Sequence, residues 1–193
     1  MDKYAHFVVH PRYGQRPRIT GLNPTEELGR TYFHWHSGDG VRVPNTAIEA
    51  DLSRQSSATV QVTHYFDAKR ECRECGKPFL FFAEEQRHWY EELGFPLESD
   101  CVLCVGCRKR QQGLARTRAR YEELFHIAAR TPDEQFEIAE CCLALVEAGM
   151  FHLRQLEHVR AFLKSLPSEL DPHAQERLTT LRTRVRRMEE TAE

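Results

Sequence analysis

Five of the seven cysteines lie close together in the middle of this 193-residue chain, at spacings typical of metal ligands. One clear C-x2-C pair is Cys72 and Cys75, and a triplet at equal spacing follows: Cys101, Cys104 and Cys107. Thiolates at the corners of a tetrahedron select zinc over hard cations such as Mg²⁺. The cysteines therefore predict a closed four-thiolate zinc site, with one more sulfur available than the ion needs.

The choice within the triplet rests on the charges on either side of it. Cys107 is expected at the start of a helix, where exposed N–H groups and the positive end of the helix dipole stabilise a thiolate. Arg108 follows it and would offset the negative charge of zinc held by four thiolates. Cys101 follows Asp100, whose charge disfavours a thiolate. These arguments favour Cys104 with Cys107, and Cys101 with Cys104 remains the alternative pair.

Other uses of these cysteines are less favoured. A disulfide framework does not fit a chain without a secretion signal, because the cytosol keeps thiols reduced. A redox C-x2-C pair needs a βαβ setting, which is not evident here. Reduced core cysteines rarely repeat this spacing. Iron–sulfur ligation is chemically possible but less favoured than zinc. Zinc is therefore the expected cofactor.

Two strands and a short helix are expected to position the cysteines. Residues 58–66 alternate along the chain with a period of two, which predicts a strand ahead of the first pair. The apolar run 78–82 predicts a second strand. Residues 83–93 predict a helix with an acidic first turn, and Gly94 is well placed to end it.

The chain is expected to be all-helical from Arg108 onward. The sequence Thr131-Pro132-Asp133-Glu134 predicts a capping box at the start of one helix. Helices are predicted over four segments: 107–130, from Thr131 to Gly149, 151–165, and from Asp171 onward.

Composition indicates a soluble globular protein, with 40% hydrophobic and 29% charged residues. No apolar run approaches the roughly 20 residues of a membrane span, and the N-terminus lacks the layout of a signal peptide. We therefore expect a cytoplasmic location and no membrane partner. The expected fold class is α+β, in three parts: a β-containing N-terminal segment (1–70), a zinc ribbon (71–112) and an all-α C-terminal bundle (113–193).

The net charge of −2 conceals one concentrated basic stretch over 108–120, where six residues are basic and none is acidic. These residues are Arg108, Lys109, Arg110, Arg116, Arg118 and Arg120. At helical spacing, Lys109, Arg116 and Arg120 share a face that could follow the phosphates of a nucleic acid. The chain as a whole is slightly acidic, which favours a solvated helix face instead.

The run 72–112 resembles the zinc-ribbon domains of bacterial proteins, whose pattern is CxxC, an aromatic strand, an EQ-containing helix, a GF turn and CxxCR. The matching residues are Cys72, Cys75, Phe79, Phe82, Glu85, Gln86, Tyr90, Gly94, Phe95, Cys104, Cys107 and Arg108. Residues 43–48 are more loosely similar to segments upstream of the ribbon in some such proteins. The resemblance aligns Cys104 and Cys107 as ligands and leaves Cys101 outside. It implies a structural zinc and no particular reaction.

No catalytic motif accompanies the cysteines: G-x-S-x-G, H-E-x-x-H and a glycine-rich phosphate loop are all missing from the sequence. A zinc held by four cysteines also has no open position for water or substrate. His34 and His36 would share one face of a strand, but no spacing links them to other histidines as a second metal site. We expect a non-enzymatic zinc protein that acts as a protein-interaction adaptor, with a nucleic-acid-binding module as the alternative.

Overall fold

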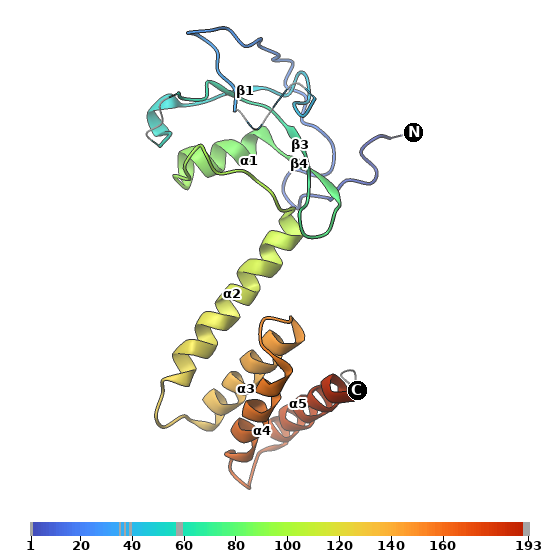
Figure 1. The fold of residues 1–193 in the computed structure, drawn as a ribbon, viewed down its shortest axis with the longest axis vertical. Helices are drawn as coiled ribbons and strands as arrows, with labels where there is room; N and C mark the ends of the chain where they lie inside the picture. Colours follow the sequence, from blue (N-terminus) through green and yellow to red (C-terminus); the bar gives the residue numbers. More distant parts are fainter. Residues whose placement is uncertain (1, 35, 37, 39, 57–59, 191–193) are drawn as a thin grey trace. The chain divides into compact units, whose positions relative to one another are not determined.

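The computed structural model describes residues 2–34, 36, 38, 40–56 and 60–190 (Figure 1). Along the chain, two compact units follow one another, Met1–Arg108 and Lys109–Glu193. Short antiparallel strands occur in the first unit, and helices make up the second. The fold class is therefore α+β, as predicted.

The β structure of the first unit consists of two separate antiparallel pairs. In one pair, β1 (Ile48–Glu49) lies beside β2 (His64–Tyr65). In the other, β3 (Ala68–Glu71) lies beside β4 (Pro78–Phe81), which confirms the strand predicted over 78–82. The turn between β3 and β4 contains the first cysteine pair.

The strand predicted over 58–66 is wrong for most of its length. Residues 58 and 59 lie outside the described residues, and of the remainder only the two residues of β2 form a strand. The N–H of Val62 instead donates to Gln55 Oε1 at 3.1 Å, and the carbonyl of Val62 accepts from Gln55 Nε2 at 2.7 Å. A buried amide side chain thus replaces a neighbouring strand as the backbone's partner, which a period-two pattern cannot reveal.

The helix predicted over 83–93 is present as two consecutive segments, α1 (Ala83–Arg87) and the π-helical η2 (His88–Glu92). Its first N–H group is satisfied from outside the helix, because Asp67 Oδ1 accepts from the N–H of Ala83 at 2.7 Å. Gly94 has a φ of +68°, so the expected left-handed stop is confirmed. Upstream of these elements, η1 (Leu52–Arg54) is a single 3-10 turn.

Small clusters of buried apolar side chains form the core of the first unit. Buried polar groups connect them. Gln86 is 2% exposed and donates to the carbonyls of Phe66, at 2.6 Å, and Phe81, at 2.9 Å. Its side chain therefore joins α1 to the hairpin strand β4 and to the segment before β3.

The N-terminal arm (residues 2–20) contains no helix or strand. It is nevertheless attached to the rest of the first unit. The N–H of Val8 donates to the carbonyl of Pro78 at 2.8 Å, and the N–H of Arg18 donates to Asp67 Oδ2 at 2.7 Å. The same buried carboxylate of Asp67 therefore holds both the arm and the start of α1.

Helix α2 (Val105–Phe125) begins in the first unit and continues into the second. The other helical elements of the second unit are α3 (Pro132–Glu147), η3 (Leu153–Gln155), α4 (Leu156–Lys164) and α5 (Pro172–Glu190). One apolar core joins them, with Leu124 of α2, Leu143 of α3, Val159 of α4 and Leu181 of α5 among its members.

Two helix ends of the second unit are capped by side chains, one as predicted and one not. At Thr131 the predicted capping box is confirmed: Thr131 Oγ1 accepts from the N–H of Glu134 at 3.3 Å, and Glu134 Oε2 accepts from the N–H of Thr131 at 2.8 Å. Helix α2 ends at Phe125 rather than at the predicted Arg130. The guanidinium of Arg130 donates to the carbonyls of Leu124 and Phe125, at 2.7 Å each, and so caps the helix end.

Candidate metal centre

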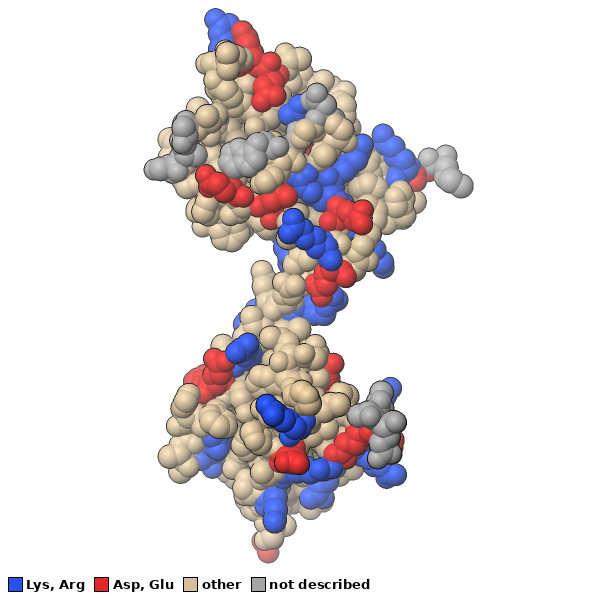
Figure 2. Space-filling model, viewed as in Figure 1, with Lys and Arg blue, Asp and Glu red and all other residues tan. Residues whose placement is uncertain are grey.

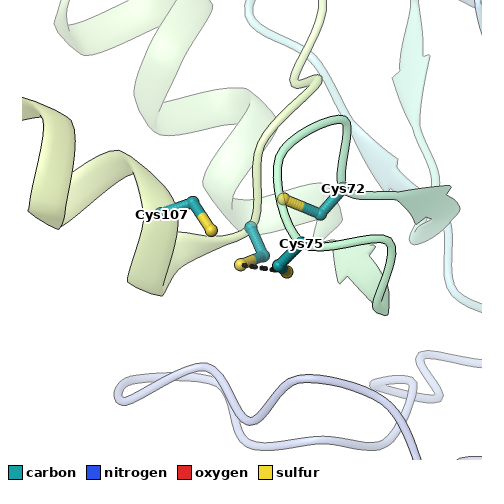
Figure 3. A group of neighbouring side chains, drawn as sticks. Cys72, Cys75 and Cys107 are labelled. Carbon is teal, nitrogen blue, oxygen red and sulfur yellow. Dashed lines mark hydrogen bonds between the residues drawn. The ribbon is translucent and has the colours of Figure 1, made fainter. Parts of the chain in front are cut away.

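Four of the five clustered cysteines converge on one point. The Sγ atoms of Cys72, Cys75, Cys104 and Cys107 all lie within 4.8 Å of one another. Their side chains point toward a common centre, with the sulfurs of Cys75 and Cys104 3.9 Å apart (Figure 3). Tetrahedral zinc–sulfur bonds of about 2.3 Å separate the sulfurs by about 3.8 Å, so this donor set fits a metal ion with only a small contraction.

The first pair is held by the turn between β3 and β4. The N–H of Gly76 donates to the carbonyl of Cys72 at 2.8 Å, and the N–H of Cys72 donates to the carbonyl of Lys77 at 3.0 Å. Gly76 has a φ of +66°, a conformation that costs glycine little and other residues more. The glycine after the C-x2-C pair therefore allows the turn that aims both sulfurs at the same point.

The second pair lies at the beginning of α2. The carbonyl of Cys104 accepts from the N–H of Arg108 at 3.0 Å, so Cys104 stands immediately before the helix and Cys107 lies in its first turn. N–H groups without helical partners and the positive end of the helix dipole are found at this place. The helix start that the sequence predicts beside the last cysteine is therefore present.

The sulfurs influence one another's titration. Burial by itself would raise the pKa of Cys72, but backbone N–H groups of Cys104 and Cys75 that donate to its sulfur lower the pKa to about 6. Burial, and next the sulfur of Cys104, raises the pKa of Cys107. Thiolates gathered in one place repel, and a bound cation reverses that effect by stabilising all of them.

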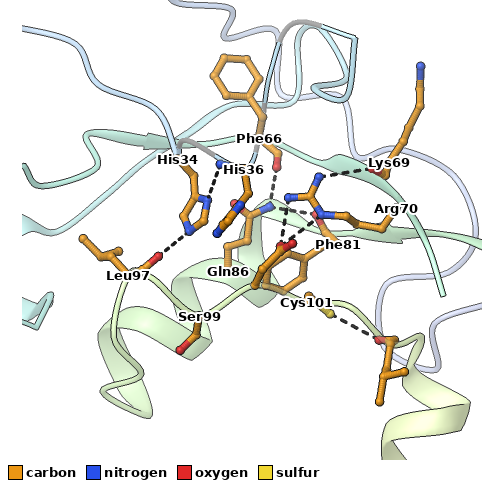
Figure 4. Close-up of polar contacts among 12 residues, drawn as sticks. His34, His36, Phe66, Lys69, Arg70, Phe81, Gln86, Leu97, Ser99 and Cys101 are labelled. Atoms are coloured by element: carbon orange, nitrogen blue, oxygen red, sulfur yellow. Dashed lines mark hydrogen bonds and ion pairs between the residues drawn. The ribbon is translucent and has the colours of Figure 1, made fainter. Parts of the chain in front are cut away.

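Cys101 lies outside the four-sulfur group, among the apolar side chains of Ala68, Phe79 and Phe81. It is 1% exposed, and its thiol donates to the carbonyl of Leu103 at 3.4 Å (Figure 4). Burial raises the pKa of Cys101 to about 12, while the charge of Arg108 works in the opposite direction. An apolar environment thus keeps this sulfur protonated.

The charge of the neighbouring Asp100 contributes less to the raised pKa of Cys101 than expected. Asp100 forms an ion pair with Arg70 at 3.1 Å, and its charge ranks below burial among the causes that raise the pKa of Cys101. Cys101 lies outside the four-sulfur group, as expected. Its apolar environment disfavours the thiolate more than the charge of Asp100 does.

Arg108, which follows the last cysteine, is held in place by side chains of α1 and η2. Its Nη2 donates to Glu85 Oε1 at 2.5 Å, and its guanidinium lies over the ring of Trp89, 4.9 Å from the ring centre. Glu85 is 6% exposed, and its Oε1 also lies 3.6 Å from His10 Nε2 of the arm. Glu85 could not be predicted as a partner of Arg108, because ion pairs between distant residues leave no local pattern.

Carboxylates pair with three of the six basic residues of the stretch. Besides the pair made by Arg108, Arg118 pairs with Glu122 at 2.9 Å, and Arg120 pairs with Glu123 at 2.8 Å and Glu137 at 2.6 Å. The remaining members are exposed side chains of α2: Lys109, Arg110 and Arg116. On the face of the second unit shown in Figure 2, basic and acidic side chains lie intermixed.

The two histidines considered for a second metal site make hydrogen bonds instead. His34 is 4% exposed, and its Nε2 bonds to the carbonyl of Leu97 at 2.7 Å, while its Nδ1 accepts from the N–H of His36 at 3.3 Å (Figure 4). Burial lowers the pKa of His34 to about 4, so its ring is neutral near pH 7. Among the described residues, the four cysteines are the only group of three or more such side chains placed to hold a metal ion.

None of the described helices is both long enough and apolar enough to cross a bilayer.

Comparison with known proteins agrees with this arrangement over part of the chain. Residues 66–115 match a family model described as a probable treble clef domain, a range that contains β3, β4, α1, both cysteine pairs and the start of α2. No match was found among curated proteins, and none among solved structures. The match supports the expected metal-binding domain in the coarser form of a treble clef, and the second pair lies at a helix start, as expected. Residues 66–115 of this chain are similar to treble clef domains.

Proposed function

We propose that this protein is a non-enzymatic zinc protein in which one structural zinc ion joins the β3–β4 turn to the start of α2. The observation that supports this most directly is the convergence of Cys72, Cys75, Cys104 and Cys107 within 4.8 Å. Four thiolates fill a tetrahedral coordination shell and leave no position for water or substrate. The ion would supply folding free energy to a unit whose apolar clusters are small.

The test of this metal centre is a comparison of two variants purified with their metal. Cys107→Ala removes a ligand and should lose bound zinc, whereas Cys101→Ala should retain one equivalent per chain, as measured by elemental analysis. Cobalt substitution, followed by absorption spectroscopy, would report the number of thiolate ligands. Retention of zinc by Cys107→Ala together with loss from Cys101→Ala would show that the ligand set is wrong.

We further propose that the second unit works as a protein-interaction adaptor in the cytoplasm. Three large apolar side chains of this unit are exposed: Phe125 is 48%, Met150 42% and Leu153 40% exposed. The rings of Phe125 and Phe151 both contact Tyr121, which places these side chains near one another. Such exposed apolar groups are typical of protein contacts. A cytoplasmic location fits seven free cysteines, because reducing compartments preserve thiols.

Nucleic-acid binding remains the competing proposal, and ion pairs count against it. Since Arg108, Arg118 and Arg120 are paired with carboxylates, fewer cations stay available to displace counterions from phosphates. The experiment is a pull-down from native cytosol with and without nuclease. Phe125→Ser with Met150→Ser should abolish capture of a protein partner, and Leu28→Ser, at a 94% exposed apolar side chain of the first unit, is the matched control. Capture that depends on Lys109 and Arg116 and falls steeply with salt would favour nucleic acid instead.

A further inference from the structure

A small cavity with a volume of about 130 Å³ lies beside α1, apart from the cysteine cluster. Three residues of the N-terminal arm line one side of it: Arg12, Tyr13 and Arg18. The opposite side is formed by α1 and η2, with Arg87 as their contribution to its positive charge. Three guanidinium groups therefore meet around one cavity, two from the arm and one, that of Arg87, from a segment far along the sequence.

The arm presents its side chains from a rigid loop. The backbones of His10 and Gly14 exchange two hydrogen bonds, of 2.7 and 2.8 Å, and so close residues 10–14 into a tight turn. Inside the turn, His10 Nδ1 accepts from the N–H groups of Arg12 and Tyr13, at 3.2 Å each. The loop is thus ordered by its own hydrogen bonds, so that a ligand would not have to order it first.

The phenol ring of Tyr13 supports the two arginines of the arm. The guanidinium carbon of Arg12 lies 5.4 Å from the ring centre, and that of Arg18 lies 5.7 Å from it. Planar guanidinium groups on an aromatic ring keep their N–H edges available for an anion.

Carboxylates compensate this positive charge only in part. Arg18 pairs with Glu84 at 2.5 Å, and Glu92 pairs with His88 at 2.6 Å. Among the residues that the structure describes, neither Arg12 nor Arg87 has a carboxylate within ion-pair distance. Without counting His88, three arginines against two glutamates leave the lining with a net charge of +1.

We propose that this cavity binds a single phosphate group, either inorganic phosphate or the phosphate of a small phosphomonoester. Guanidinium groups match the oxygen geometry of phosphate with paired N–H donors, and charge-assisted hydrogen bonds are the strong ones. The volume admits one tetrahedral oxyanion and is too small for a nucleotide, whose sites are on the order of 300 Å³ or more. Arg12 and Arg87 would donate the main hydrogen bonds to the phosphate, because Arg18 is already paired with Glu84.

The experiment titrates the full-length, zinc-loaded chain with inorganic phosphate at low ionic strength, followed by NMR of backbone amides and by calorimetry. Arg12→Gln and Arg87→Gln should each weaken binding about tenfold. Arg16→Gln is the matched control, because Arg16 lies on the same arm but pairs with Asp2 outside the cavity lining. A parallel titration with O-phosphoserine distinguishes the two ligands. If the natural ligand is a phosphomonoester, O-phosphoserine should bind more tightly than inorganic phosphate. If it is free phosphate, inorganic phosphate should bind more tightly.

A gain of affinity provides the sharper test, since misfolding cannot produce one. Glu92→Gln removes a negative charge from the lining and should tighten phosphate binding several-fold. Absence of saturable phosphate binding by the unmodified chain would overturn the proposal. So would equal affinities of the Arg12→Gln, Arg16→Gln and Arg87→Gln variants.

Discussion

In the second unit, one continuous core of buried apolar side chains joins α2, α3, α4 and α5, whereas the buried apolar side chains described in the first unit fall into four small clusters. Buried polar groups such as Asp67, Gln86 and Gln55 bridge those clusters, and one cluster contains the cysteines. The second unit can thus be stabilised by apolar burial alone. We expect the first unit to depend on the proposed metal centre and on hydrogen bonds that each join distant segments.

Metal removal should produce the largest difference in stability between the two units. A chelator, or Cys107→Ala, should unfold the first unit, because the β3–β4 turn and the start of α2 then lose their common anchor. The second unit should keep its helices. Hydrogen exchange measured by mass spectrometry would resolve the two, with full protection retained in α3 and α5. Equal loss of protection in both units would contradict the comparison.

A cavity in the helical core should destabilise the second unit and leave the first unit intact. Leu143 is 0% exposed at the centre of that core, and Leu143→Ala should reduce the free energy of unfolding of the second unit by about 2–5 kcal/mol. Zinc content should stay at one equivalent. Urea denaturation followed by circular dichroism at helical wavelengths gives the first quantity, and elemental analysis gives the second. Zinc loss in this variant would mean that the metal centre needs the helical core.

Acid should destabilise the first unit partly through His34. Its pKa is lowered to about 4 by burial, against an unfolded value near 6.5, so the stability it contributes is complete above about pH 6.5 and is lost as pH falls toward 4. Between pH 7.5 and 5.5 this amounts to about 1 kcal/mol. His34→Gln should reduce the acid sensitivity of unfolding by that amount, as followed by tryptophan fluorescence in urea. An unchanged pH dependence would remove His34 as a cause.

Loss of the capping box should have the smallest effect and should stay local. Thr131→Ala leaves the N–H of Glu134 without its side-chain partner and should cost the second unit about 1 kcal/mol. Thr131→Ser is the matched control, because serine keeps the hydroxyl acceptor and should restore most of the stability. Thermal unfolding of both variants would measure the difference. A larger loss in the first unit than in the second would be inconsistent with two separately stabilised units.

Local features account for the parts of the fold that were predicted correctly. The capping box at Thr131 and the left-handed glycine at Gly94 depend on neighbours within a few residues, and both are found where expected. The strand over 58–66 and the end of α2 depended on Gln55 and Arg130, whose side chains bond to backbone groups several residues away. No periodic pattern contains that information, since one side chain decides the outcome.

The sequence by itself determined which chemistry is available at the candidate site: two C-x2-C spacings, a glycine that permits the turn, and a helix that begins beside the second pair. The tertiary structure decided which sulfur is excluded, because Cys101 lies among Ala68, Phe79 and Phe81, where burial keeps its thiol protonated. It also paired Arg108 with Glu85 and brought Arg12 close to Arg87. Spacing along the chain sets local geometry, whereas burial and charge compensation depend on residues that only folding brings together.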